Sequence, residues 1–346
     1  MIGPVGTAEN ERLTTRLGRE RFLRRRPAGF GEEASVSVRI AIAAAADAKL
    51  RTAVGTMSGS DPRIAAMATE RARATLAAID REAAAFTLLV SVPEEMPEAE
   101  IREFLRPAYE AAAFEEVTIV RERREDVLVH VSAFGGGTLE ADLRRNRESA
   151  IATEGHNDAA SSEAMQSAAD SKWFIVMVGS AGIEGTLLQY ERNRETMEAR
   201  YPKHFLERIG ELPKQAATAE IIRTGLAAGA AVAVPGGDGG VYGALWKLGE
   251  KLRCGMNVEL PQIPIAQITI EVCETVDIDP YQIPAGGSVL FVTADPERLI
   301  KELQDAPSEN APKIETSVIG YLTREAARIL RNRGEERYLE PYRGGV

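Results

Sequence analysis

The alternation of apolar and polar positions in the first half of the chain predicts short strands between helices. Alternating or continuous apolar segments predict strands at 34–42, 86–92, 117–120 and 126–134. Helical spacing predicts helices at 10–26, from Asp61-Pro62 to about Ala83, and after the pair Pro93 and Pro97. This order of elements is typical of an α/β layer domain.

A second series of elements starts at Trp173. Apolar segments predict strands at 173–178, 230–234, 288–293 and 315–321. The predicted helices are a long one ending near Arg200 and further ones at 203–211, 217–229, 241–252 and 296–305. The second series is also α/β, so the fold class that we expect is α/β (α+β) in two domains.

The two series are separated by a polar stretch. Residues 138–171 are mostly Ala, Ser, Glu, Asp and Arg and hold no convincing strand, which predicts a linker or an insertion. We therefore expect an N-terminal domain at 1–137 and a C-terminal domain at 172–346. The length of 346 residues agrees with two domains at roughly 100–200 residues each.

Composition excludes a disordered chain, because 44% of the residues are hydrophobic and 27% are charged. The formal net charge of -10 argues against a broad basic surface for nucleic acid. Residues 1–30 nevertheless hold seven arginines against three glutamates. The run Arg24-Arg25-Arg26 is either a contact for RNA or an acidic partner, or a solvated helix face.

Cysteine usage and hydropathy predict a cytoplasmic protein. The chain has two cysteines, Cys254 and Cys273, with no CxxC spacing, which fits a reducing compartment. No segment approaches ~18 uninterrupted apolar residues, and the N-terminus lacks the apolar region of a signal peptide. The three histidines show no metal-ligand spacing, so we expect no zinc site. Either cysteine would need a nearby base to act as a nucleophile, and none is implied.

Two glycine turns carry the candidate chemistry. Asp238, Gly239 and Gly240 lie in a Pro-Gly-Gly-Asp-Gly-Gly turn between a strand and a helix, where backbone amides and the helix N-terminus can bind a phosphate. The alternative is a tight connection without a ligand. In the second turn, Glu184 either reaches a metal or a substrate amine, or caps its own helix N-terminus.

Several blocks of residues 173–323 are similar to one enzyme superfamily. They are Ala181-Gly182-Ile183-Glu184-Gly185-Thr186, Asp238-Gly239-Gly240-Val241-Tyr242-Gly243-Ala244-Leu245-Trp246, Ile263-Pro264-Ile265, Asp279-Pro280-Tyr281 and Gly286-Gly287-Ser288. In this order they resemble the C-terminal domain of the aminoimidazole-ribonucleotide-synthetase (PurM-like) superfamily, most of all its hydrogenase-maturation-factor-like branch. The resemblance implies a two-domain PurM-like fold, a dimer whose N-terminal domains form a barrel, and ATP and Mg²⁺ as cofactors.

The N-terminal half matches the superfamily less well. Leu88 to Phe134 fits its strand, helix and strand pair, and Glu33 stands where the family has a Gly-x-Asp-Ala-Ala motif. The family's Asn-Asp would fall on Ala74 and Thr75, and its Gly-Gly-His-Thr turn near Arg121 to Arg123. Because Mg²⁺ prefers hard oxygen ligands and phosphoryl transfer depends on its charge, these departures predict impaired turnover.

The same holds in the second domain, where the family's His-Asp-x-Thr-x-Gly-Gly motif would place its Asp at Pro235 and its Thr at Gly237. The superfamily's hydrogenase carbamoyl-activating factor carries its group on a C-terminal cysteine, and the sequence Pro341-Tyr342-Arg343-Gly344-Gly345-Val346 holds none, so we do not expect that chemistry.

Two functions follow from the resemblance. The first is a catalytically degenerate member that acts as a homodimer or as a subunit beside an intact paralogue. The second is an active ATP-dependent enzyme that phosphorylates a carboxylate, amide or carbonyl oxygen. In that enzyme Glu33, Glu184 and Asp238 would be the acidic groups, with Gly239 and Gly240 at the phosphates; no catalytic residue is assigned. Nucleic-acid binding through Arg12 to Arg26 is the least favoured function, and no membrane association is expected.

Overall fold

The computed structural model describes residues 3–4, 51–79, 81–137, 172–305 and 314–341. The chain divides into two compact units, Met1–Thr138 and Leu139–Val346. The helix predicted at 10–26, the strand at 34–42, the linker at 138–171 and Glu33 lie outside the described residues. Among the residues that are described, no helix is long and apolar enough to cross a membrane.

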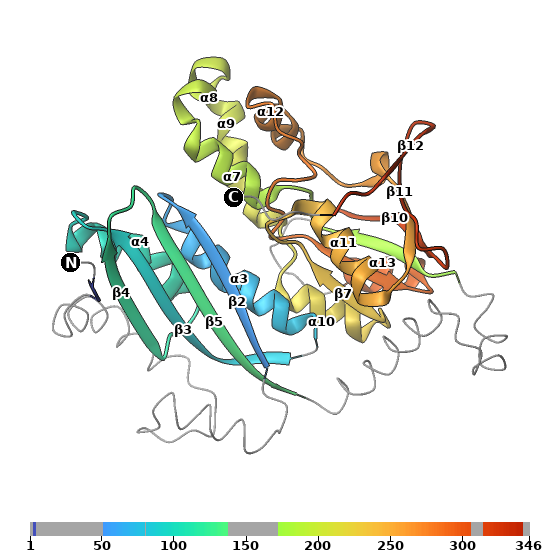
Figure 1. Ribbon diagram of the computed structural model, residues 1–346, viewed down its shortest axis with the longest axis horizontal. Coiled ribbons are helices and arrows are strands. Elements are labelled where there is room, and N and C mark those ends of the chain that lie inside the picture. The colour runs from blue at the N-terminus through green and yellow to red at the C-terminus, as the bar shows by residue number, and fades with distance from the viewer. Residues whose placement is uncertain (1–2, 5–50, 80, 138–171, 306–313, 342–346) are drawn as a thin grey trace. The chain divides into compact units, whose positions relative to one another are not determined.

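The first unit is a mixed sheet with helices on one face (Figure 1). Its strands have the order β1-β4-β3-β5-β2. They are β1 (Gly3–Pro4), β2 (Arg51–Gly59), β3 (Arg81–Pro93), β4 (Glu116–Glu122) and β5 (Val127–Gly137). The two helices are α3 (Arg63–Ala77) and α4 (Glu98–Ala111).

Burial alternates along these strands because α3 and α4 cover one face only. Val90 of β3 and Val129 of β5 are fully buried beneath the helices. Leu89 of β3 and Val54 of β2 point to the other face, where they are 41% and 49% exposed. Half of each strand therefore forms the core, and the other half forms an outer face.

The second unit is a seven-stranded sheet with the order β12-β11-β8-β10-β6-β9-β7. The strands are β6 (Phe174–Val178), β7 (Val232–Pro235), β8 (Gly255–Glu259), β9 (Val289–Thr293), β10 (Thr316–Thr323), β11 (Arg328–Asn332) and β12 (Glu335–Tyr338). The α-helices are α7 (Ile183–Arg192), α8 (Arg194–Arg200), α9 (Lys203–Leu206), α10 (Ala219–Ala227), α11 (Gly240–Leu252), α12 (Gln267–Thr275) and α13 (Pro296–Asp305). Two 3-10 helices are η1 (Glu207–Gln215) and η2 (Leu260–Gln262).

Both faces of this second sheet are packed. Leu290 of β9 belongs to the core cluster that includes Leu245 of α11. The next residue, Phe291, points to the opposite face, where its ring lies against Gly225 of α10. A Cβ on Gly225 would come within 2.5 Å of that ring, so glycine permits the close approach of helix and strand.

Two predicted helices are wrong in extent. The helix expected to reach Ala83 ends at Ala77, and β3 begins at Arg81, because residues 81–83 pair with residues 135–137 of β5. The long helix expected to reach Arg200 is interrupted at Asn193, whose side-chain amide donates to the Gln189 carbonyl at 2.9 Å. Asparagine competes in this way for backbone groups that would otherwise continue the helix.

Sequence patterns also missed β2, β8, β11 and β12. The helix expected at 203–211 is a short α9 followed by η1, which extends to Gln215 and contains Pro213. The helix predicted at 296–305 is confirmed by α13, and the strand predicted at 288–293 is confirmed by β9 within one residue.

Candidate functional site

The two glycine turns lie in the second unit, each between a strand and a helix. Residues 179–182 connect β6 to α7, and residues 236–239 connect β7 to α11. Both turns use left-handed glycines where the helix begins, with φ of 66° at Gly182 and 64° at Gly240. The strand–turn–helix arrangement predicted from the sequence is therefore present at both places.

A third segment, residues 279–288, lies against both turns; we call it the bridging loop. Gly185 N donates to Pro284 O at 2.8 Å, which ties the bridging loop to α7. Ala285 N donates to Gly237 O at 3.0 Å, which ties it to the other turn. Three segments that are distant in sequence thus form one hydrogen-bonded unit.

The bridging loop occupies the start of α11. Tyr242 N donates to Tyr281 O at 3.2 Å, and Gly240 N donates to Gly237 O at 3.0 Å. A Cβ on Gly240 would lie 2.3 Å from Tyr281 O, so this glycine is needed for the approach of the loop. Two amides that a phosphate would use therefore already bind carbonyls of the chain.

Glu184 is in the first turn of α7 and is only 1% exposed. Its Oε2 accepts a hydrogen bond from Gly286 N of the bridging loop at 3.1 Å. Gly182, the N-cap of α7, has no side chain with which to cap the helix. Because a buried carboxylate must be hydrogen-bonded, this contact explains its position without a ligand. The Glu184 carboxylate thus binds the bridging loop, and both alternatives that the sequence leaves open for it stay predictions.

Asp238 is exposed in the turn before α11, whereas Gly239 and Gly240 are buried. Of these three consecutive residues, only the aspartate is exposed to solvent. The arrangement does not fit a phosphate at the first turn of α11 in this conformation. The nucleotide-binding role of Asp238, Gly239, Gly240 and Glu184 stays a prediction.

A cluster that the sequence analysis missed lies beside the α11 turn. The rings of Tyr242 and Tyr281 are 5.5 Å apart, and Arg337 of β12 donates a hydrogen bond to the Tyr242 hydroxyl. Burial, followed by the charge of Asp279, raises the pKa of both tyrosines. The cluster thus joins two protonated, largely buried tyrosines to the cation of Arg337, and these residues are up to nearly a hundred positions apart, so no local pattern connects them.

The positions where the resemblance requires acidic or histidine side chains serve other contacts. Thr75 lies on α3, and its hydroxyl donates to Arg71 O at 2.9 Å. Arg121 at the end of β4 donates to the carbonyls of Glu94 and Met96 at 3.0 and 2.7 Å. Within the described ranges, no group of three or more His, Cys, Asp or Glu is arranged to hold a metal ion.

Comparison with known proteins yields matches among solved structures only, because neither a family model nor a curated protein matches the chain. E. coli HypE is similar with a TM-score of 0.68 and 15% identity over 97% of this chain and 98% of that one. The hydrogenase maturation protein HypE in complex with ATP gives a TM-score of 0.65 and 12% identity over 96% and 94%. Thiamine-monophosphate kinase from Stenotrophomonas maltophilia K279a gives 0.60 and 16% over 97% and 99%.

These matches cover both units and nearly the full length of each relative, so the whole fold is shared rather than one domain of it. HypE and thiamine-monophosphate kinase belong to the superfamily that the sequence blocks resemble. The chain has the two-domain fold of the aminoimidazole-ribonucleotide-synthetase (PurM-like) superfamily.

Proposed function

We propose that this chain is a catalytically degenerate member of the PurM-like superfamily that acts as a subunit or partner. The observation that carries the proposal is that backbone amides and a carboxylate at the two glycine turns already form hydrogen bonds with other groups of the same chain. The amides of Gly240 and Tyr242 bind carbonyls, and Glu184 binds the amide of Gly286. Pro235 stands where the family motif places an aspartate, and it offers no ligand for Mg²⁺.

The outer face of the first unit's sheet supports the partner role. It is formed by alternate residues of β2 to β5, and those within 52–58, 85–91, 118–120 and 128–134 include no Asp, Glu, Lys or Arg. At the ends of β3 and β4, the same side carries Glu82, Glu116 and Glu122. Val54 and Leu89 are exposed in the central part, in a chain of which 27% is charged. A surface whose centre lacks charged residues and exposes apolar ones is typical of protein–protein interfaces.

The partner on this face is a second copy or an intact paralogue, as the resemblance implies. Sedimentation equilibrium of the full chain tests the first choice, and we expect a dimer. Co-expression with a tagged superfamily paralogue tests the second, with a 1:1 complex as the expected result. A chain that remains monomeric in both experiments contradicts the partner role.

The degenerate site predicts that the purified chain alone does not hydrolyse ATP in the presence of Mg²⁺. Asp238→Asn and Glu33→Gln serve as controls, because they remove two of the three candidate carboxylates. Measurable hydrolysis by the unsubstituted chain that disappears in both variants would overturn the proposal.

The alternative function is an active ATP-dependent enzyme that acts on a carboxylate, amide or carbonyl oxygen. The observation that favours it is the similarity to a HypE structure that contains ATP. In that case Glu33, Glu184 and Asp238 would bring acidic groups to the nucleotide and to Mg²⁺, with Gly239 and Gly240 near the phosphates. Isothermal titration with ATP and Mg²⁺ separates the two functions, since the alternative requires saturable binding at millimolar nucleotide or below.

A further inference from the structure

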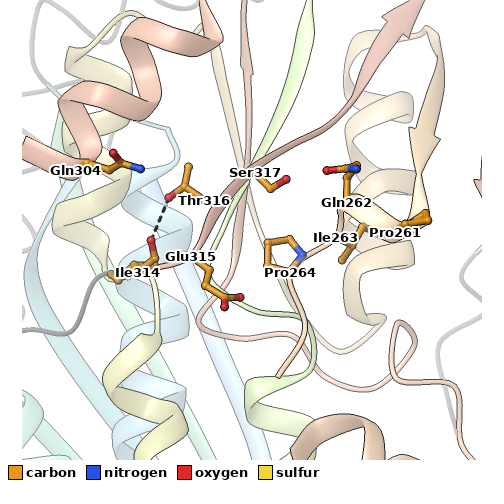
Figure 2. A pocket seen from close by; sticks show the side chains of 9 residues that line it. All are labelled: Pro261, Gln262, Ile263, Pro264, Gln304, Ile314, Glu315, Thr316 and Ser317. Atoms are coloured by element: carbon orange, nitrogen blue, oxygen red, sulfur yellow. Dashed lines mark hydrogen bonds between the residues drawn. The ribbon is translucent and has the colours of Figure 1, made fainter. Parts of the chain in front are cut away.

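The second unit has a hollow of about 480 Å³ whose lining residues lie outside the two glycine turns (Figure 2). It lies where the segment after β8, the C-terminal end of α13 and the start of β10 meet. Its polar lining consists of Gln262, Gln304, Glu315, Thr316 and Ser317. A volume of this size is within the range of pockets for small molecules.

The floor of the hollow is held by hydrogen bonds from the β6–α7 turn. Gly179 N donates to Glu315 O at 2.8 Å, and Ala181 N donates to Pro264 O at 2.7 Å. Ser180, which is 1% exposed, donates its hydroxyl to Glu315 Oε2 at 3.1 Å. The Glu315 carboxylate is therefore oriented by a buried hydroxyl, and its other oxygen has no hydrogen-bond partner in the described part of the chain.

The charge of the lining is negative. Among the nine described residues that line the hollow, Glu315 is the only ionisable one, and none of the nine is Lys, Arg or His. An anion such as a phosphate would face this carboxylate without a counter-charge, whereas a cation would be attracted to it. The hollow therefore favours a cation, whereas the two glycine turns were predicted to bind an anionic phosphate.

Uncharged polar groups surround the carboxylate. Figure 2 shows Gln304 and Gln262 on opposite sides of the hollow, with Thr316 and Ser317 between them. The Thr316 hydroxyl already donates to Ile314 O at 3.3 Å. The two carboxamides make no side-chain hydrogen bond within the ranges described. Each can both donate and accept, which suits the hydroxyl groups of a ligand.

We propose that this hollow binds a polyhydroxylated primary amine, the chemistry of an amino sugar or an amino alcohol. Glu315 pairs with the ammonium group, and Gln262 and Gln304 bind hydroxyl groups on the two sides. The site consists of second-unit residues alone, and it requires neither a nucleotide nor a partner chain, so it goes beyond the proposed function.

Saturation-transfer NMR of the full chain with glucosamine tests the proposal, with glucose as the uncharged counterpart of the same shape. For a polar ligand of this size we expect a Kd in the low millimolar range. Because Glu315 is exposed, its ion pair contributes modestly, and glucose should bind about threefold to fivefold more weakly. Glu315→Gln should reduce glucosamine affinity by the same factor and leave glucose unchanged.

Glu195→Gln is the matched control, because Glu195 is an exposed glutamate on α8 outside the lining. Gln304→Ala is a second variant, and it should weaken both sugars equally. Equal affinity for glucosamine and glucose would overturn the assignment of an amine. The absence of saturation by glucosamine up to about 50 mM, far above the expected Kd, would overturn the site itself. Either result leaves the proposed function untouched, since no assay here contains ATP or a partner.

Discussion

In the first unit's sheet, residues alternate between buried and exposed, whereas β6 and β9 of the second sheet are buried almost along their whole length. β2 shows the alternation from Thr52 to Met57, and every residue of β9 is buried. The difference follows from the helices, which cover one face of the first sheet and both faces of the second. A sheet with one face that the described helices leave uncovered has a surface to offer a partner, and a sheet with two covered faces has a core.

The largest expected effect tests the two covered faces of the second sheet. Leu290→Ala and Phe291→Ala remove side chains from opposite faces of β9, and both are buried. Each should lower the free energy of unfolding by about 3 kcal/mol, because both substitutions leave a cavity. Urea unfolding followed by tryptophan fluorescence measures this, since Trp173 and Trp246 both lie in the second unit.

The corresponding pair in the first sheet should behave asymmetrically. Val90 is fully buried and Leu89 is 41% exposed on the outer face. We expect Val90→Ala to cost about 2 kcal/mol and Leu89→Ala less than about 0.5 kcal/mol. Circular dichroism during urea unfolding of both variants gives the comparison. Equal losses would show that the outer face is as buried as the inner one.

Leu89→Asp tests whether the outer face of the first sheet binds a partner. A charge in an apolar interface is costly, so this variant should abolish the proposed pairing while the monomer remains folded. Sedimentation equilibrium gives the oligomeric state, and Thr87→Asp on the same face of β3 should act alike. A dimer that tolerates both charges contradicts pairing through this face.

The strands that the sequence reveals come from both sheets, since β3, β4 and β5 of the first were predicted and β8, β11 and β12 of the second were missed. Continuous apolar segments such as 230–234 and 288–293 are conspicuous, and both were predicted. β2 was missed because its buried positions are the small or weakly patterned Ala53, Gly55 and Met57. Gly55 is required there, since a Cβ would lie 1.9 Å from Ala68 O of α3. Close packing of a strand on a helix thus weakened the apolar signal.

The candidate site was predictable only where it depends on residues that are close together in the sequence. Glycine spacing places both turns correctly, because the strand and helix that flank each turn are local features. The bridging loop was not predicted to fill the space between them. Its contacts join Gly286 to Glu184 and Tyr281 to Tyr242, and single-sequence patterns do not report pairings at such distances.

Alkaline pH should distinguish the units, because both cysteines lie in the second one. Burial raises the pKa of the Cys254 thiol to about 11 and that of Cys273 to about 12, from 9.0. Above pH 9 the unfolded thiols ionise while the folded ones stay protonated, so stability falls as pH rises toward the folded pKa values. The loss is roughly 1.4 kcal/mol per thiol for each pH unit.

Tryptophan fluorescence at pH 8 and pH 10 measures this loss for the second unit. The variant with Cys254→Ala and Cys273→Ala should be less stable at pH 8, because it lacks two buried side chains, but its stability should depend less on pH. An unchanged pH dependence in that variant would show that other groups cause the loss.

The smallest effect compares one substitution in the two units. Tyr109 of α4 has a buried hydroxyl without a hydrogen-bond partner in the described part of the chain, and burial raises its pKa. Tyr109→Phe should therefore stabilise the first unit by about 1 kcal/mol, since it removes an unsatisfied polar group. Tyr242→Phe should destabilise the second unit by a similar amount, because it leaves Arg337 without its hydroxyl acceptor. Thermal unfolding of both variants checks the opposite signs. A destabilising Tyr109→Phe would contradict the unsatisfied hydroxyl, and a stabilising Tyr242→Phe would contradict the contribution of the Arg337 hydrogen bond.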